Sequence, residues 1–243
     1  MTWVTSDGAR PYARRVAAKH TRQRVLRKVS GNSRRADYSS ATRRALVEVA
    51  MRLFTAQGYA GTSLDQIVAG ARVTKGALYH HFDGKQALFE SVFEKVEDRC
   101  TKTVTKALRN TGDPWDKAMV GLRAFLEVVQ EPAYRRIVVQ EGPSVLGYER
   151  FREQEERSAY GIVQDIVSSV LDSYTEASVV EPGTVEAFTR LFYGAMAAAG
   201  TAVAAAEDPE RASREVAAAM DFILTGMRAL GEAGIAPAAT SAP

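Results

Sequence analysis

A run of four residues, Thr74, Lys75, Gly76 and Ala77, combines side chains that could contact DNA. The threonine hydroxyl and the lysine ammonium group can donate hydrogen bonds to phosphate oxygens or to base edges. The glycine and the alanine are small enough to let a helix approach a duplex closely. The run therefore predicts a surface that binds nucleic acid, provided that it lies at the exposed end of a helix.

Three polar residues follow this run, Tyr79, His80 and Lys85, and each could reach the phosphate backbone. Ordinary structural roles fit the same residues. Tyr79 could belong to the core, His80 could be a solvated surface residue, and Lys85 could be a first-turn lysine of a helix. The spacing alone leaves both interpretations open.

The elements that must position these residues form four short helical segments within residues 42–95. The first segment has apolar residues at a period near 3.6 and stops at Gly58, a residue suited to a left-handed C-terminal cap. Its apolar positions are Leu46, Val49, Ala50, Leu53 and Phe54. The second begins at Ser63, which forms a capping-box pattern with Gln66, and ends near Gly70.

The third segment, Thr74 to Phe82, opens on a threonine N-cap and has few bulky apolar residues, so its outer face is free. The fourth begins with an Asp-x-x-Gln cap at Asp83 and continues as a long connecting helix. Two short helices joined by a tight turn, the second polar outside, match the geometry in which the second helix enters a major groove.

This block resembles the N-terminal domain of the TetR family of transcriptional regulators. The resemblance rests on Gly58-Tyr59, Thr62-Ser63, Ile67, Ala71, Val73 to Phe82, Lys85 and Leu88, without a gap. In that family DNA is contacted by the hydroxyl residue that opens the second helix, by the small residues and tyrosine of the third, and by the lysine that follows. The corresponding positions here are Thr62, Ser63, Thr74, Lys75, Gly76, Ala77, Tyr79, His80 and Lys85.

Length and composition fit a soluble protein. The 243 residues are 46% hydrophobic, enough for a sizeable core, and no apolar run approaches the roughly 18 residues that span a bilayer. The single cysteine, Cys100, excludes an internal disulfide and a cysteine metal cluster, which fits a reducing cytoplasm.

The net charge of +3 hides an uneven distribution. Residues 1–36 carry 10 Lys or Arg and one Asp, whereas residues 96–243 carry 15 basic and 22 acidic residues. An acidic body with a basic N-terminal end suits a protein that meets a polyanion by that end. The basic segment itself has three interpretations, which stay open: an arm that follows phosphates or enters the minor groove, a disordered tail, or sequence upstream of the true start codon.

Beyond residue 96 the pattern is helical throughout. The connecting helix should end near Asn110, and Asp113 and Pro114 should begin the next one. Pro132 restarts a short helix, residues 141–147 are predicted as a loop, and one helix is predicted from about Tyr148 to Tyr174.

The last two predicted helices run from Thr184 to Glu207 and onward from the N-cap Asp208. The first of them is rich in Gly and Ala, which allows close helix approach. In the resembling family the last two helices form a four-helix dimer interface, so we expect a homodimer through them, with an intrachain core helix as the alternative. A dimer would present two reading helices to a palindromic operator.

The resemblance also implies a small organic effector bound among the middle helices, which releases the protein from DNA. Aromatic and large apolar residues are the candidates for the pocket lining, although any one of them could be ordinary core. They are Trp115, Phe125, Tyr134, Leu146, Tyr148, Phe151, Tyr160, Phe188 and Phe192. The three histidines all lie in the first third of the chain, so an organic effector is favoured over a metal ion.

We therefore predict an all-α chain. It has a basic, disordered extension at 1–36, a three-helix helix-turn-helix domain at 37–84, a ligand-binding and dimerisation domain at 85–230, and a flexible tail at 231–243. No cofactor motif or catalytic constellation is present, so an enzyme is not expected. The alternative function is a DNA-coating protein, indifferent to sequence, that binds through its basic arm.

Overall fold

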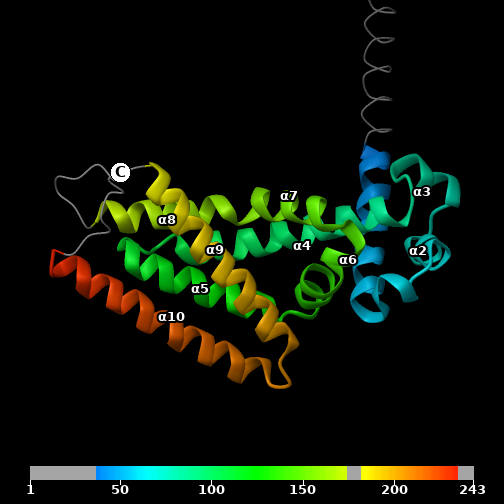
Figure 1. The fold of residues 1–243 in the computed structure, drawn as a ribbon. Coiled ribbons are helices and arrows are strands. Elements are labelled where there is room, and N and C mark those ends of the chain that lie inside the picture. The colour runs from blue at the N-terminus through cyan, green and yellow to red at the C-terminus, as the bar shows by residue number, and fades with distance from the viewer. Residues whose placement is uncertain (1–36, 174–181, 235–243) are drawn as a thin grey trace, which may run out of the picture.

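The computed structural model describes residues 37–173 and 182–234; the predicted extension at 1–36 and most of the predicted tail lie outside these ranges. Within them the chain is built of helices alone, as the sequence predicts, with a small head at one end of an elongated body (Figure 1). A first helix at residues 37–61, α2 (Leu64–Ala71) and α3 (Lys75–His81) form the head. The helix α4 (Lys85–Leu108) runs from the head into the body.

The body continues with α5 (Pro114–Gln130), the π-helix η1 (Tyr134–Glu141) and α6 (Gly142–Leu146). The remaining helices are α7 (Tyr148–Ser158), α8 (Tyr160–Asp172), α9 (Pro182–Ala205) and α10 (Pro209–Glu232). None of the helices in the described ranges is long and apolar enough to cross a membrane.

Several predicted caps are confirmed. Asp113 accepts hydrogen bonds from the backbone N–H groups of Trp115 and Asp116, and Pro114 fills the first position of α5, where no N–H is needed. Asp208 caps α10 by accepting a hydrogen bond from the Arg211 backbone N–H, and Pro209 begins the helix. Gly58 has the predicted left-handed φ of +75°, but the prediction that the first helix stops there is wrong, because the helix continues to residue 61.

Three further local predictions are wrong. The cap of α4 is Gly84, which offers no side-chain hydrogen bond, and not the Asp83 pattern. Residues 142–146 form α6 instead of a loop, because Pro143 in the first turn of a helix is compatible with helical geometry. The single helix expected from Tyr148 is interrupted at Ala159, so it forms two helices, α7 and α8.

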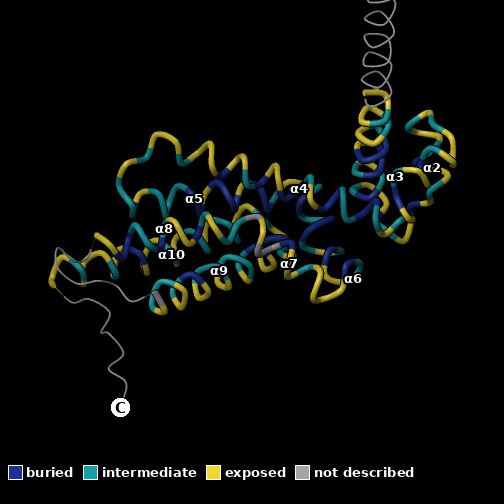
Figure 2. Tube along the Cα trace, turned by 90° about the horizontal axis from the view of Figure 1, so that it is seen from above, coloured by how far each residue is buried: buried dark blue, intermediate teal, exposed yellow. Residues whose placement is uncertain are grey.

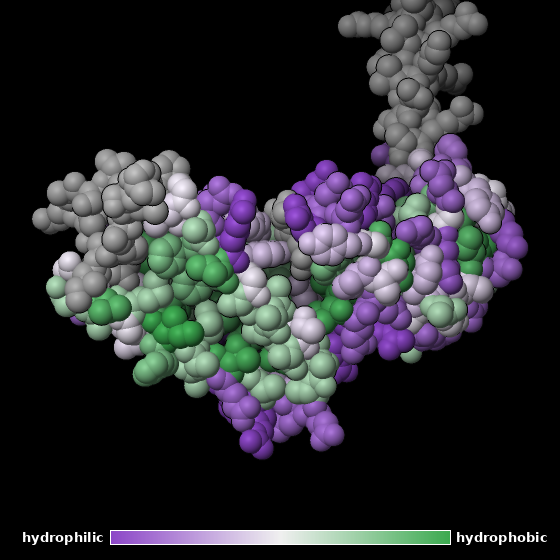
Figure 3. All heavy atoms as spheres, in the orientation of Figure 1, coloured by the Kyte–Doolittle hydropathy of each residue, from purple (hydrophilic) through white to green (hydrophobic). Residues whose placement is uncertain are grey.

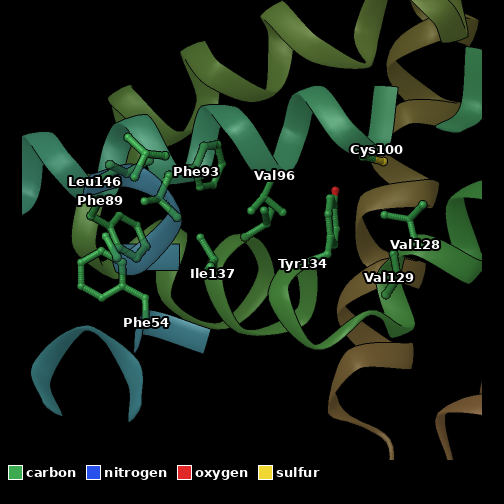
Figure 4. Packing of buried hydrophobic residues seen from close by; sticks show 14 of the residues in the cluster. Phe54, Phe89, Phe93, Val96, Cys100, Val128, Val129, Tyr134, Ile137 and Leu146 are labelled. Carbon is green, nitrogen blue, oxygen red and sulfur yellow. The ribbon is translucent and has the colours of Figure 1, made fainter. Parts of the chain in front are cut away.

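One apolar core runs from the head into the body along α4. In the head, Phe54 of the first helix packs against Phe89 of α4, with ring centroids 5.3 Å apart. Farther along α4, Val96 and Cys100 are buried against the body helices α5 and η1 (Figure 4). Buried residues follow the whole length of this helix, so head and body share it as a common wall (Figure 2).

Candidate DNA-binding site and effector pocket

The helix α2 is fixed at its start by the predicted capping box. The backbone N–H of Gln66 donates to the Ser63 hydroxyl at 3.2 Å, and the backbone N–H of Ser63 donates to the Gln66 side chain at 2.8 Å. Ser63 is exposed, and its hydroxyl hydrogen is not used by the cap. The residue is therefore held in place with a donor left for a phosphate.

The helix α3 is anchored on one side and open on the other. Thr74 caps it by accepting a hydrogen bond from the Ala77 N–H at 3.2 Å, while Leu78 is fully buried beneath it. Tyr79 is 57% exposed and His80 is exposed as well, which excludes the core interpretation of Tyr79. The leading end and outer face of α3 thus carry the predicted polar residues on the surface of the head.

The ammonium group of Lys75 is not free in this state. It lies 2.7 Å from the Asp65 carboxylate of α2, and both side chains are largely exposed. The hydrogen bond to Asp65, followed by the charge of the same carboxylate, raises the pKa of Lys75. Because the pair is exposed, water and salt weaken it, and a phosphate could replace the carboxylate.

Thr62 and Lys85 lie differently from the other expected contacts. Thr62 is only 1% exposed, and its hydroxyl donates to the Gly58 carbonyl at 2.8 Å, so its side chain does not reach the surface. The Lys85 ammonium group donates to the carbonyls of Tyr59 and Thr62 at 2.7 and 2.9 Å and lies 4.2 Å from the Tyr59 ring centroid. In this state both residues fix the turn between the first helix and α2.

The same turn is tied to the body. The backbone N–H of Tyr59 donates to the Glu141 carboxylate at 2.9 Å, and Glu141 ends the π-helix η1. Arg136, also on η1, forms an ion pair with Glu141 at 3.1 Å. We call these residues, Tyr59, Glu141 and Arg136, the clamp. The clamp joins the head to the element that forms one wall of the cavity described next.

The body contains a partly open cavity of about 280 Å³, lined mainly by η1 and α9 and also by residues of α4, α5, α6, α7 and α8. Three of the predicted pocket residues line it: Phe125, Tyr134 and Phe151. A narrower, apolar cavity of about 80 Å³ lies between α4, α5, α8, α9 and α10, and the predicted residues Phe188 and Phe192 line it together with Phe125. Ala159, at the break between α7 and α8, touches both cavities.

Four predicted pocket residues line neither cavity. Trp115 is buried with Val170 and Leu224 in a small apolar cluster, and Leu146 belongs to the core beside α4. Tyr148 is exposed, and the Tyr160 ring packs on Tyr193 with centroids 5.5 Å apart. Residue type and helical spacing did not separate cavity-lining residues from the others, because periodicity does not show which buried face of a helix meets a cavity.

Glu97 is the main lining residue that the sequence analysis missed. It is 6% exposed and lines the larger cavity with Tyr193 and Thr201. A signal was present, since Glu97 falls on the buried stripe of α4 that also contains Phe93, Val96 and Cys100. An acidic residue on such a stripe must find a polar partner inside the protein.

Glu97 affects the ionisation of two buried neighbours, Cys100 and Tyr134. Burial raises the pKa of Cys100 to about 12, and the charges of Glu97 and Glu131 add to the shift. Burial, then the charge of Glu97, raises the pKa of Tyr134 well above its usual value, and the Tyr134 hydroxyl is hydrogen-bonded to Glu97. This hydroxyl points from η1 toward α4 (Figure 4). Across the described ranges, no group of three His, Cys, Asp or Glu side chains is placed to hold a metal ion.

Comparison with known proteins agrees with this arrangement of head and body. The profile described as "Bacterial regulatory proteins, tetR family" matches residues 46–92, and the profile "Tetracyclin repressor-like, C-terminal domain" matches residues 115–227. The chain belongs to the TetR family. The first match covers the head with the start of α4, and the second covers most of the body.

Individual TetR-family proteins extend the comparison. The chain is 46% identical over 100 residues to the HTH-type transcriptional regulator AcrR of Shigella flexneri, covering 41% of this chain and 46% of AcrR. It thus spans about half the length of curated relatives of this kind. A TetR-family transcriptional regulator from Pectobacterium atrosepticum has a similar structure, with a TM-score of 0.67 and 28% identity over 78% of this chain and 95% of that one.

The fold is also shared with RolR, whose structure was solved in complex with resorcinol. The TM-score is 0.59 at 18% identity, covering 84% of this chain and 98% of RolR. At this identity the likeness concerns the fold alone.

Proposed function

We propose that the protein is a ligand-responsive transcriptional regulator that acts as a repressor in the cytoplasm. The observation that carries the proposal is the outer face of α3, which is polar and exposed while Leu78 anchors its inner face in the head. This is the arrangement that a recognition helix needs in order to enter a major groove without losing its support.

The exposed residues divide into two roles. At the leading end of α3, Thr74 and Lys75 would read base edges, with Gly76 and Ala77 allowing close approach. Ser63, Tyr79 and His80 would contact phosphates and set the register of the head on the duplex. Thr62 supports the turn from inside. The Lys85 ammonium group gives two of its three N–H donors to carbonyls, and the third would be its contact with a phosphate.

A homodimer through α9 and α10 would place two such heads on one operator. Large apolar side chains on these helices are exposed, among them Phe222, which is 81% exposed, with Leu191, Ile223 and Leu230. Hydrophobic atoms form a broad patch over this side of the body (Figure 3). Gly194 and Gly226 have open space where a side chain would stand, whereas a Cβ at Gly200 would lie 3.1 Å from the Phe125 ring of the same chain. A second copy on this patch would make a symmetric interface.

The larger cavity would hold a small organic effector. Its wall includes Tyr134 and Val138 of η1, and the same π-helix ends at the clamp on the head. A ligand that shifts η1 would therefore move Glu141 against Tyr59 and change the orientation of α3. Release from DNA then requires only that the ligand bind the shifted state more tightly.

We assign the protein no catalytic step. Two side chains of nucleophilic type in the described part of the chain, Cys100 and Ser144, are poorly suited to such a step. Cys100 is buried with a pKa near 12, and the Ser144 hydroxyl donates to the Glu141 carbonyl at 3.0 Å.

The test is the selection of binding sites from a randomised DNA pool with the purified full chain. An enriched palindrome, with half-sites spaced about one helical turn apart, is expected. The selected site should bind roughly 10³-fold or more tightly than random DNA. Salt-sensitive binding without enrichment would overturn the proposal and indicate the coating function instead.

A further inference from the structure

The narrower cavity, of about 80 Å³, has an apolar wall. Among the described residues that line it, none has a charged side chain, and only Thr101 and Cys100 carry a hydroxyl or thiol group. Burial raises the pKa of Cys100 to about 12, so this thiol is uncharged at neutral pH. Because a buried water molecule needs several polar partners, such a wall favours an apolar occupant.

The narrower cavity is also long and thin. Ile162 and Leu171 of α8 both line it, and nine residues of helix separate them by about 14 Å. The helix α9 lines the same cavity from Phe188 to Met196. Its volume of about 80 Å³ is about half of the roughly 150 Å³ of a compact cavity that binds benzene. Spread over this length, the space is too thin for a ring but suits an unbranched alkyl chain.

A glycine leaves part of this space open. Gly121 lies in the middle of α5 and lines the narrower cavity, although glycine is less favourable than alanine inside a helix. A Cβ at this position would lie 3.6 Å from both Ile166 and Leu108, which is an ordinary contact distance. The packing of α5 therefore does not require glycine here. Its absent side chain leaves room beside Ile166, and a chain in the cavity would use that room.

The two cavities adjoin each other. Four residues line both of them: Phe125, Ala159, Val163 and Met196. The lining of the larger cavity is partly polar, since it includes Tyr193 and Thr201. A molecule with an apolar chain and a polar end can therefore place the chain in the narrower cavity and the polar end in the larger one.

We propose that the narrower cavity binds an unbranched alkyl chain, and that the effector is an amphiphilic molecule whose polar end occupies the larger cavity. The inference rests on the proposed function, since it names the class of effector. An apolar wall of this shape selects a ligand by the length and the thinness of its chain.

The first test compares three linear alcohols, 1-hexanol, 1-octanol and 1-decanol, with 1-adamantanol, whose ten carbons form a compact cage. Binding to the full-length protein is measured by isothermal titration calorimetry without DNA. Each buried CH₂ group strengthens binding by up to about fourfold, so the affinity should rise at least tenfold from 1-hexanol to 1-decanol. We expect 1-adamantanol to bind at least tenfold more weakly than 1-decanol. Equal affinities of the linear alcohols, or binding of the cage as tight as that of 1-decanol, would overturn the proposal.

Two glycine variants locate the chain. Gly121→Leu places a side chain in the narrower cavity and should weaken the binding of 1-decanol at least tenfold. Gly161→Leu makes the same change on α8 at an exposed residue that lines neither cavity, where a Cβ would meet nothing within 4 Å, and should leave the affinity unchanged.

Binding of 1-decanol that survives Gly121→Leu would contradict the assignment and indicate another apolar site, such as the exposed patch on α9 and α10. Leucine is more favourable than glycine in a helix, and thermal unfolding of both variants checks that they are folded. The affinities of the wild-type protein for the three linear alcohols decide the question even if Gly121→Leu folds poorly.

A separate measurement keeps this inference apart from the proposed function. Operator DNA from the selection experiment is titrated in the presence of saturating 1-decanol. Loss of operator affinity supports both ideas. Binding of 1-decanol that Gly121→Leu removes, without any change in operator affinity, confirms the chain site and refutes its role in the response. A selected palindrome together with no binding of the linear alcohols overturns the inference and leaves the DNA-binding function standing.

Discussion

Replacing Gly58 with alanine should destabilise the protein strongly, because two separate features of the turn require glycine. The backbone there has a φ of +75°, in the left-handed region that costs an L-residue roughly 1–2 kcal/mol. A Cβ at this position would also lie 2.3 Å from Nη2 of Arg136 and 2.5 Å from Oε1 of Glu141. Both atoms are the ends of flexible side chains, so they can move away, but only by disturbing the clamp.

The second contribution is therefore the lost clamp. The Tyr59 N–H to Glu141 hydrogen bond has an ionised acceptor and is partly buried, which makes it worth about 1.5–3 kcal/mol. Together with the backbone strain, Gly58→Ala should lower the free energy of unfolding by roughly 2.5–5 kcal/mol. In a chain of this size the melting temperature should fall by about 5 to 20 °C.

The matched control is Gly61→Ala, three residues farther along. Gly61 does not have a positive φ, and a Cβ there would meet only Cβ of Gln57 at 3.4 Å. It should be neutral or stabilise by about 0.4–1 kcal/mol. Unfolding is measured in urea at one protein concentration, because the stability of the proposed dimer would depend on concentration.

A double-mutant cycle tests the cause. In the Glu141→Ala background the clamp is already absent, so Gly58→Ala should cost only the backbone strain. The reasoning is refuted if the free energy of unfolding of Gly58→Ala lies within about 0.5 kcal/mol of the wild-type value. It is also refuted if the effects of the two substitutions on that free energy are fully additive.

Three further predictions concern DNA, assembly and pH. Lys85→Met should weaken binding to every DNA sequence. The reason is found by measuring the binding constant at several salt concentrations. If Lys85 contacts a phosphate, the variant lowers the slope of log binding constant against log salt concentration by about one, whereas a purely structural role leaves that slope unchanged. Phe222→Asp should shift the protein from dimer to monomer in analytical ultracentrifugation, while Tyr38→Asp, on an equally exposed residue of the head, should not; a Phe222→Asp dimer would refute the assigned interface. The pKa of Cys100 is raised from 9.0 to about 12, so the folded state retains a proton that the unfolded state loses. The contribution of Cys100 to the free energy of unfolding is complete below pH 9 and is lost as the pH rises toward 12. Cys100→Ala should therefore remove part of the loss of stability that urea unfolding measures at alkaline pH. An unchanged pH dependence in this variant would contradict the prediction.

The parts of the fold that the sequence predicts are those with local causes. Ser63, Thr74, Asp113 and Asp208 cap helices where the pattern places them, because a short polar side chain satisfies the free N–H groups of the adjoining turn. The exposed face of α3 follows from its few apolar residues in the same way.

The parts that failed have causes outside the local sequence. Pro143 was interpreted as a residue that ends a helix, but it occupies the first turn of α6. Nothing in the local pattern explains the interruption at Ala159. The contacts of Lys85 with Tyr59 and Thr62 were not predicted, because they join residues that are 26 and 23 positions apart in the sequence. The buried stripe of α4 indicates that Glu97 is buried, but it does not show that Glu97 lines a cavity, because a cavity depends on how several helices pack.

The shared wall formed by α4 limits how this regulator could be recombined with others. Phe89 lies beyond the predicted end of the head at residue 84, yet it packs in the head against Phe54 and Tyr59. A hybrid protein that joins this head to a foreign body at residue 84 would leave that aromatic cluster incomplete. A crossover placed after Val96 would carry the cluster intact, but it would still separate Tyr59 from Glu141. On the proposed function, such a hybrid would keep its operator and lose its response to the effector.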